Sequence, residues 1–243
     1  VTVPALDPGR AHAVVAASGC RTAKVKVAEP GQGEADDVAR VAAVRDALGP
    51  SGRLRVDANG AWDVDTAARL LRRLDGFDLE YAEQPVATLQ EMAALRRRVD
   101  VPLAADESVR TADDPLRIAG LAAADLVVLK VQPLGGVHAA LRVAEAVGLP
   151  VVVSSAVETS VGLAAGLALA AALPELRYAC GLGTRSLLND DVVAAPLDPS
   201  GGSLTVRRPG VDPAALARCT PPEPDAHALV DRLVAAARAG GLH

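Results

Sequence analysis

Charged residues recur along the chain at intervals that suit one shared site. Asp57, Glu83, Asp106 and Lys130 follow one another at spacings of 23 to 26 residues, and Lys26 precedes Asp57 by 31 residues. An interval of this size holds one strand, one helix and two loops. Each residue stands at or near the end of a short apolar run that predicts a strand. In a parallel β/α barrel, the catalytic residues lie at these strand ends.

Three of these residues are carboxylates, and carboxylates converging from neighbouring strands predict a metal site. Asp57, Glu83 and Asp106 would form a cage of hard oxygen ligands with the charge that Mg²⁺ prefers, and would leave positions for water or a substrate carboxylate. The alternative is a set of separate ion pairs, such as Lys26 with Asp57. Charges at successive strand ends of a barrel favour the shared site.

The lysines predict acid–base chemistry at the same place. Lys24 and Lys26 are two residues apart and therefore share one face of a strand. A neighbouring ammonium and a nearby divalent cation lower the pKa of a lysine toward neutrality, as a general base requires. Lys130 would face the site from the opposite side of the barrel. A neutral lysine would remove an alpha proton while a charged one balances the resulting enediolate.

Three polar residues beside this series have less certain roles. Asn59 shares a strand face with Asp57, and Gln132 shares one with Lys130, so both either contact a substrate or orient the lysines. Glu107 points to the other face from Asp106 if the strand continues, which favours a structural role. The four histidines fall on predicted helices or in the tail, so catalysis by them is not expected: His12, His138, His227 and His243.

The elements around these residues predict an α/β fold, a (β/α)7β TIM-like barrel. Eight short runs rich in Val and Leu predict parallel strands at 1–5, 22–27, 54–58, 79–83, 102–106, 125–131, 150–155 and, more weakly, 177–181. Apolar residues at helical spacing predict helices at 8–18, 34–48, 63–74, 88–99, 113–123, 136–147 and 160–173. Capping signals stand at Asp63, at Thr88 with Glu91, and at Asp113.

The alternation of strands and helices stops near residue 182, which predicts a division of the chain into two parts. Residues 1–189 would form the barrel, and residues 190–243 an irregular tail. The tail is rich in Pro, Asp and Gly up to residue 222, with one strand-like stretch at 203–206. Residues 225–239 have the pattern of a terminal amphipathic helix.

Composition narrows the function classes. A net charge of −5 with interspersed acids and bases gives no basic stripe for nucleic acid, and no apolar run is long enough to span a membrane. The three cysteines, Cys20, Cys180 and Cys219, lack metal-binding or disulfide spacing and favour a reducing compartment, hence the cytoplasm. These features indicate a cytoplasmic protein that acts on a small carboxylate.

The motifs in this order resemble a known family. K24-V-K26, V56-D-A-N59, E83-Q-P85, D106-E-S108 and L129-K-V-Q-P-L-G-G136 are similar to the barrel of the enolase superfamily, muconate-lactonising subgroup. The resemblance covers about residues 1–190. It implies that Asp57, Glu83 and Asp106 are Mg²⁺ ligands, with Lys26 as acid and base. It further implies that Lys24 is the electrostatic partner of Lys26, and that Lys130 is the opposite cation.

Two later segments narrow the resemblance. S154-S-A-V-E-T-S-V-G162 and Y178-A-C-G-L-G-T184 are most similar to the actinobacterial o-succinylbenzoate synthases of menaquinone biosynthesis. That family syn-dehydrates 2-succinyl-6-hydroxy-2,4-cyclohexadiene-1-carboxylate. The resemblance implies a substrate pocket lined by four small residues: Ser154, Ser155, Gly181 and Gly183. The alternative is that these residues only form turns at the ends of the strands.

Two other functions stay open. The same lysine pair suits racemisation of N-succinylamino or other N-acylamino acids by a two-base mechanism. The family also carries an N-terminal α+β capping domain that closes over the barrel, and no segment of this sequence matches it. This predicts a capless barrel, and allows an inactive one that binds only a metal or a partner.

Overall fold

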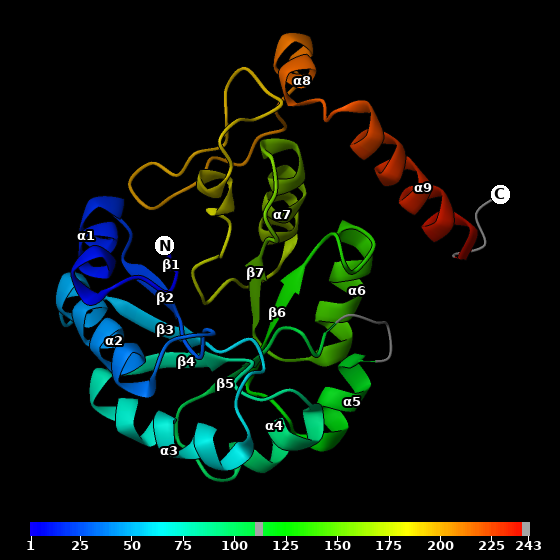
Figure 1. The fold of residues 1–243 in the computed structure, drawn as a ribbon. Helices are drawn as coiled ribbons and strands as arrows, with labels where there is room; N and C mark the ends of the chain where they lie inside the picture. Colours follow the sequence, from blue (N-terminus) through cyan, green and yellow to red (C-terminus); the bar gives the residue numbers. More distant parts are fainter. Residues whose placement is uncertain (110–113, 240–243) are drawn as a thin grey trace.

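A curved parallel sheet forms the centre of the molecule (Figure 1). The computed structural model describes residues 1–109 and 114–239. Seven strands lie in chain order across one sheet, and each pairs in parallel with the next. They are β1 Thr2–Val3, β2 Thr22–Lys26, β3 Arg53–Asp57, β4 Leu79–Glu83, β5 Leu103–Ala105, β6 Leu126–Lys130 and β7 Val151–Ser154.

Helices follow the strands and lie around the outside of the sheet, as Figure 1 shows. They are α1 Pro8–Ser18, α2 Glu34–Leu48, α3 Val64–Leu74, α4 Leu89–Arg96, α5 Asp114–Leu121, α6 Val137–Val147 and α7 Ser160–Ala172, with a short 3₁₀ helix η1 at Asp75–Phe77. Small aliphatic side chains fill the layer between helices and sheet. The predicted fold class, a TIM-like α/β barrel, is confirmed.

Local capping signals position the helices that follow the strands. The Asp63 carboxylate accepts a hydrogen bond from the Thr66 amide at 2.9 Å, at the start of α3. Thr88 and Glu91 form a reciprocal capping box at the start of α4. Helix α4 ends at Arg96, three residues before the predicted end. The predicted cap at Asp113 lies outside the described residues.

A second core lies on the inner face of the sheet. Its buried members are Tyr81, Ala104, Leu126, Val128 and Val152, with Tyr178 packed against them. Tyr81, Val128 and Val152 each stand two residues before the last residue of their strand, so they share the face of those terminal residues. The layer beneath the mouth therefore combines apolar side chains with two cations on the same face, Lys24 of β2 and the buried Arg55 of β3.

The predicted eighth strand, at 177–181, is wrong in extent. Only Gly181 pairs with the sheet, through a single parallel bridge to Ser154 of β7. Two backbone hydrogen bonds form there, from the Gly181 amide to the Val153 carbonyl at 2.8 Å and from the Ser155 amide to the Gly181 carbonyl at 3.2 Å. Nearby, the guanidinium of Arg55 donates to the Ala179 carbonyl at 2.9 Å and lies 4.6 Å from the Tyr81 ring centroid. Backbone and side-chain contacts together therefore hold this segment beside β7.

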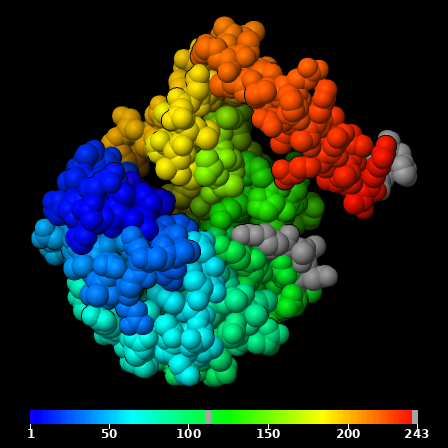
Figure 2. Space-filling model, viewed as in Figure 1, coloured from blue at the N-terminus to red at the C-terminus, as the bar shows by residue number. Residues whose placement is uncertain are grey.

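The tail after the barrel differs from the prediction in two places. It contains a 3₁₀ helix η2 (Thr184–Leu187), helix α8 (Pro213–Cys219) and helix α9 (Glu223–Ala239). Helix α8 was not predicted, and the strand expected at 203–206 is absent from this described stretch. Figure 2 shows the orange and red segment standing out from the ring of strands and helices, and none of the residues of α9 is buried. The division at residue 190 stays a prediction.

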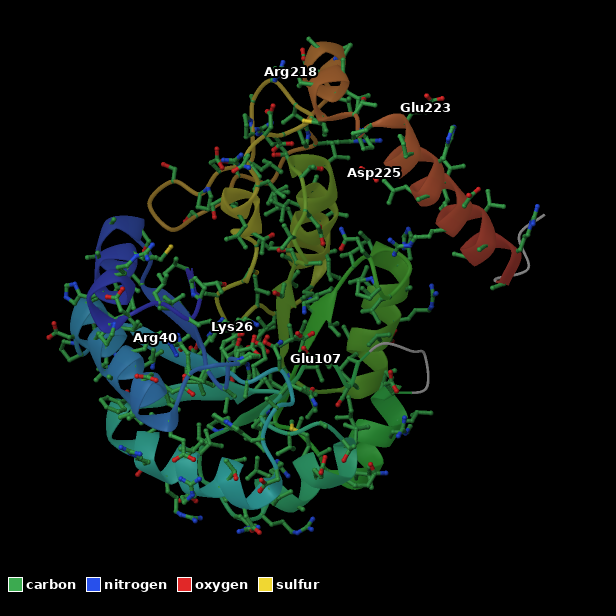
Figure 3. All side chains as sticks on the ribbon, in the orientation of Figure 1. Lys26, Arg40, Glu107, Arg218, Glu223 and Asp225 are labelled. Atoms are coloured by element: carbon green, nitrogen blue, oxygen red, sulfur yellow. The ribbon has the colours of Figure 1, made fainter. Side chains whose placement is uncertain are left out.

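No helix among the described residues is long and apolar enough to cross a membrane. The longest of them, α9, carries charged residues, and Figure 3 labels Glu223 and Asp225 near its start. The figure also labels Arg218, which lies on the preceding helix α8.

One buried carboxylate joins the tail to the barrel. Asp191 is 3% exposed and accepts hydrogen bonds from the amide of Ser160 at 3.2 Å and from its hydroxyl at 2.5 Å. The Ser160 hydroxyl in turn accepts from the Leu197 amide at 2.7 Å. Because Ser160 opens α7, Asp191 binds the positive end of that helix and holds the tail against it.

We expect Asp191→Ala to lower the free energy of unfolding by about 2 kcal/mol, because the Ser160 amide would lose its acceptor in a buried position. Urea titration followed by circular dichroism measures this. Asp225→Ala is the matched control, since Asp225 is an exposed residue of α9. Equal effects from the two variants would contradict the role of Asp191.

Candidate active site

Parallel pairing places the predicted site residues along one edge of the sheet. Lys26, Asp57 and Glu83 are the last residues of β2, β3 and β4, and the pairing register aligns them directly. Asp106 follows the end of β5, and Lys130 ends β6. The series that recurs along the sequence is therefore one ring in space, at the carboxyl ends of the strands.

Ion pairs link the members of this ring. The Lys24 ammonium lies 3.0 Å from Asp57 Oδ2 and also binds Glu83 Oε1. Lys26 Nζ lies 2.7 Å from Asp57 Oδ2, and Lys130 Nζ lies 2.5 Å from Asp106 Oδ2. Each carboxylate side chain is 1% exposed, so three buried negative charges are balanced by three lysines.

Burial and opposite charge act against each other in this cluster. Burial alone would lower the pKa of Lys24, but Glu83 and Asp57 outweigh it and raise that pKa above its usual range. Burial would also raise the pKa of Asp57, but Lys24 and Lys26 lower it to about 2. Burial raises the pKa of Glu83 to about 7; Lys24 opposes the shift, and Asp57 and Asp106 add to it. The Glu83 carboxylate therefore takes up a proton more readily than that of Asp57.

The two amide side chains predicted beside the lysines occupy different positions. Asn59 Oδ1 accepts a hydrogen bond from Lys26 Nζ at 2.6 Å. Gln132 Nε2 instead donates to Glu158 Oε2 at 2.6 Å and to the Gly162 carbonyl at 3.2 Å. Asn59 is thus joined to a lysine, whereas Gln132 is held by the loop and helix after β7.

The small residues predicted to line a pocket lie together at the seam between β7 and the following segment. Ser154 Oγ and Ser155 Oγ donate to the Gly181 carbonyl at 3.3 and 3.0 Å. A Cβ at Gly181 would come within 2.6 Å of Ser154 Oγ, so a larger residue there would force the Ser154 side chain to move. Gly183 lies two residues on, at the start of η2. Their roles toward a substrate stay predictions.

Two residues near the site were not assigned a site role from the sequence. Gln84 is fully buried: its Oε1 accepts from the amides of Asp106 and Ser108 at 3.0 and 3.3 Å, and its Nε2 donates to Ser108 Oγ and the Val86 carbonyl at 2.9 Å each. It therefore clamps the loop that carries Asp106. The only signal in the sequence was its place in the motif E83-Q-P85.

Glu107 is the second such residue, and the condition under which it would face away from Asp106, a continuing strand, is not met. Strand β5 ends at Ala105, so the alternation of faces does not extend to residue 107. Glu107 Oε1 accepts a hydrogen bond from Asn59 Nδ2 at 2.8 Å. Figure 3 shows Glu107 and Lys26 toward the centre of the ring of strands. Glu107 thus faces the site together with Asp106.

The described histidines and cysteines form no part of this cluster. His12 lies on α1 and contacts Asp46 at 3.2 Å, while His138 and His227 lie on α6 and α9. His243 lies outside the described residues. All three cysteines are free and partly buried.

The three buried carboxylates offer the oxygen donors and the charge that suit a divalent cation. Among the described residues, no group of three His, Cys, Asp or Glu side chains is arranged as a metal cage. The carboxylates instead engage lysines. Their chemistry nevertheless fits a cation, because the repulsion that raises the pKa of Glu83 is what a dication would relieve. Metal ligation by Asp57, Glu83 and Asp106 stays a prediction.

Comparison with known proteins identifies the family. Residues 9–211 match the model of the enolase C-terminal domain-like family, and the chain belongs to that family. Enzymes of this superfamily are metal-dependent and act on small molecules. Among relatives, o-succinylbenzoate synthase from Thermobifida fusca is 67% identical over 97% of this chain and 73% of its own length. The same enzyme from Mycolicibacterium smegmatis is 56% identical, over 96% and 72%. The resemblance predicted from the sequence is confirmed.

Solved structures agree with this family assignment. A mandelate racemase/muconate lactonizing family protein from Azoarcus sp. EbN1 matches with a TM-score of 0.81 and 26% identity, over 91% of this chain and 64% of that one. A dipeptide epimerase from Cytophaga hutchinsonii, solved with Mg and the dipeptide D-Ala-L-Val, matches with a TM-score of 0.79 and 28% identity, over 89% and 62%. The chain thus spans less than two thirds of the length of these structures.

We expect Gln84→Ala to lower the free energy of unfolding by about 3 kcal/mol, because the buried amide of Asp106 would lose its acceptor. Chemical denaturation measures the loss. Gln90→Ala, on the exposed face of α4, is the control and should change stability by less than about 0.5 kcal/mol. A Gln84 variant as stable as the control would show that the clamp contributes nothing.

Proposed function

We propose that this chain carries the barrel active site of an o-succinylbenzoate synthase, a lyase that eliminates water. One observation carries the proposal: the ring of Lys24, Lys26, Lys130 and three carboxylates stands in a chain 67% identical to one such synthase and 56% identical to another. Fold alone does not fix the reaction, because related barrels support several. The sequence identity and the site together favour this one.

The proposed reaction converts 2-succinyl-6-hydroxy-2,4-cyclohexadiene-1-carboxylate to o-succinylbenzoate, in menaquinone biosynthesis. The C–H bond alpha to the ring carboxylate breaks, and its electron pair forms the new ring double bond. The C–O bond to the 6-hydroxyl then breaks, and that hydroxide leaves with the abstracted proton as water. A cytoplasmic location is part of the proposal and fits the three free cysteines.

Lys26 is the proposed acid and base. Its Nζ lies at the carboxyl end of β2 and is held by Asp57 Oδ2 and Asn59 Oδ1. In neutral form it would take the alpha proton and return a proton to the departing hydroxyl on the same face, which makes the elimination syn. Lys24, bound to Asp57 and Glu83, is its electrostatic partner.

Lys130 is the proposed opposite cation. It ends β6, four strands from β2 around the sheet, and its ammonium is held at Asp106. From there it would stabilise the negative charge that develops on the substrate carboxylate as the alpha proton leaves. The proposed substrate contacts are the residues that rim the same edge of the sheet: Asn59, Gln132, Ser154, Ser155, Gly181 and Gly183.

Mg²⁺ is the proposed metal, held by Asp57, Glu83 and Asp106. When bound, it would supply positive charge for the carboxylate of the substrate. The structure of the Cytophaga hutchinsonii epimerase with Mg supports the choice of metal within this group of proteins. The donor set of three buried carboxylates supports it for this chain.

Racemisation of N-acylamino acids is the second candidate. Lys26 and Lys130 end β2 and β6, four strands apart along the same edge of the curved sheet, which suits a two-base mechanism. One similar structure is an N-succinyl Arg/Lys racemase from Bacillus cereus, with 26% identity and a TM-score of 0.77. Both reactions begin with removal of an alpha proton, so the substrate and the product separate them.

We expect the chain with Mg²⁺ to convert the hydroxycyclohexadiene substrate to an aromatic product, and Lys26→Ala to reduce kcat by about 10³-fold because the acid and base is lost. Loss of diene absorbance and chromatography of the product measure this. Deuterium exchange with inversion of N-succinylamino acids, without dehydration, would assign the racemase. Metal binding without either reaction would assign a barrel that only binds.

We expect Glu83→Gln to weaken Mg²⁺ binding at least about tenfold, because one of three charged ligands becomes neutral. Calorimetric titration with Mg²⁺ alone measures this and does not depend on turnover. Asp100→Asn, an exposed site after α4, is the charge-matched control. Unchanged affinity in a folded Glu83 variant would remove Glu83 from the metal site.

A further inference from the structure

Three side chains, from the end of β2 and from the loops after β3 and β5, form a hydrogen-bonded line across the mouth. Lys26 Nζ donates to Asn59 Oδ1 at 2.6 Å, and Asn59 Nδ2 donates to Glu107 Oε1 at 2.8 Å. Lys26 ends β2, Asn59 follows β3, and Glu107 follows β5. Glu107 therefore reaches the proposed acid and base through one intervening amide.

The amide of Asn59 has only one orientation that satisfies both neighbours. A lysine ammonium only donates hydrogen bonds, so the oxygen of the amide must face Lys26. The NH₂ group then faces the other way and needs an acceptor, which the carboxylate of Glu107 supplies. If the amide turned over, its NH₂ would face the ammonium and its oxygen would face the carboxylate. Glu107 therefore selects the orientation that binds Lys26.

Asn59 needs such support because packing does not fix it. It is an exposed residue with a left-handed backbone, φ +46°, and its own amide donates to Asp57 Oδ1 at 3.1 Å. A side chain exposed to solvent has other rotamers available. Without an acceptor on its far side, the amide would lose the interaction that holds it toward Lys26.

Glu107 itself stands on a fixed support. The amides on either side of it, those of Asp106 and Ser108, are both held by the buried Gln84. Its second carboxylate oxygen, Oε2, is buried and has no hydrogen-bond partner among the described residues. A buried oxygen left unpaired lowers stability, which argues against a purely structural reason for a glutamate here.

We propose that Glu107 is a positioning residue for the dehydration: it fixes the amide of Asn59, which in turn holds and orients Lys26. This inference rests on the proposed function. It assigns to Glu107 a role that is separate from metal binding by its neighbour Asp106.

Two variants of Glu107 and one matched control test the role. Glu107→Met keeps the length of the side chain and removes the acceptor, so we expect kcat to fall about 10- to 100-fold while KM changes by less than about threefold. Glu107→Gln keeps an oxygen that can accept from Asn59, so its kcat should stay within about fivefold of the original. Glu145→Gln, on the exposed face of α6, should leave both constants unchanged.

A double-variant cycle separates action through Asn59 from an independent role. Asn59→Ala should lower kcat about as much as Glu107→Met, and the combination should lose no more than the Asn59 variant alone. Losses that multiply in the combination would overturn the proposal, as would an unchanged kcat in Glu107→Met. Thermal unfolding of each variant shows whether a loss of activity is a loss of fold.

A spectroscopic measurement tests the contact without turnover. The side-chain NH₂ signal of Asn59 in a ¹⁵N–¹H spectrum, assigned by its loss in Asn59→Ala, should shift in Glu107→Met and stay near its original position in Glu107→Gln. An unshifted signal in Glu107→Met overturns the contact. If the unaltered chain shows no dehydration, the proposed function fails, and this signal alone decides whether Glu107 holds Asn59.

Discussion

The structure depends on keeping three negative charges buried at neighbouring strand ends. Asp57, Glu83 and Asp106 are almost inaccessible to water, and parallel pairing brings them to one edge. Such a cluster is stable only with compensating positive charge. Lys24, lying one layer down on β2, contacts two of the carboxylates and is the residue that joins the cluster.

This constraint also explains how the loops around the site are built. The three loops after β3, β4 and β5 are joined by side chains and backbone: Gln84 holds the loop of Asp106, and the Gly60 amide donates to the Gln84 carbonyl at 2.6 Å. Asn59 and Gln84 both have left-handed backbones, which place their side chains across to neighbouring loops. The carboxylates thus stand in a frame that resists their repulsion.

Much of the fold could be predicted because its signals are local. The period of apolar residues gave the bounds of α1 and α2, and capping residues such as Asp63 and Thr88 marked the starts of α3 and α4. The recurrence of Asp57, Glu83 and Asp106 followed from the length of a strand and helix unit. These features need no knowledge of distant contacts.

The missed features depend on contacts between distant parts of the chain. The face of Glu107 could be given only on the condition that the strand continues, because nothing local marks the end of β5 at Ala105. The eighth strand was overextended because its pairing with β7 is confined to Gly181, and the contact of Ala179 with Arg55, 124 residues earlier, leaves no trace in the local pattern. The fourfold bonding of Gln84 likewise exists only after β4 and β5 have paired.

The bond between Asp191 and Ser160 bears on the kinetics of the molecule. It joins the tail to the first turn of α7, across 31 residues of chain. We expect it to form after the barrel has folded, because it needs both the tail and α7 in place, and a contact formed that late acts mainly on the rate of unfolding. On that expectation, Asp191 contributes to how long the native barrel persists more than to how quickly it forms.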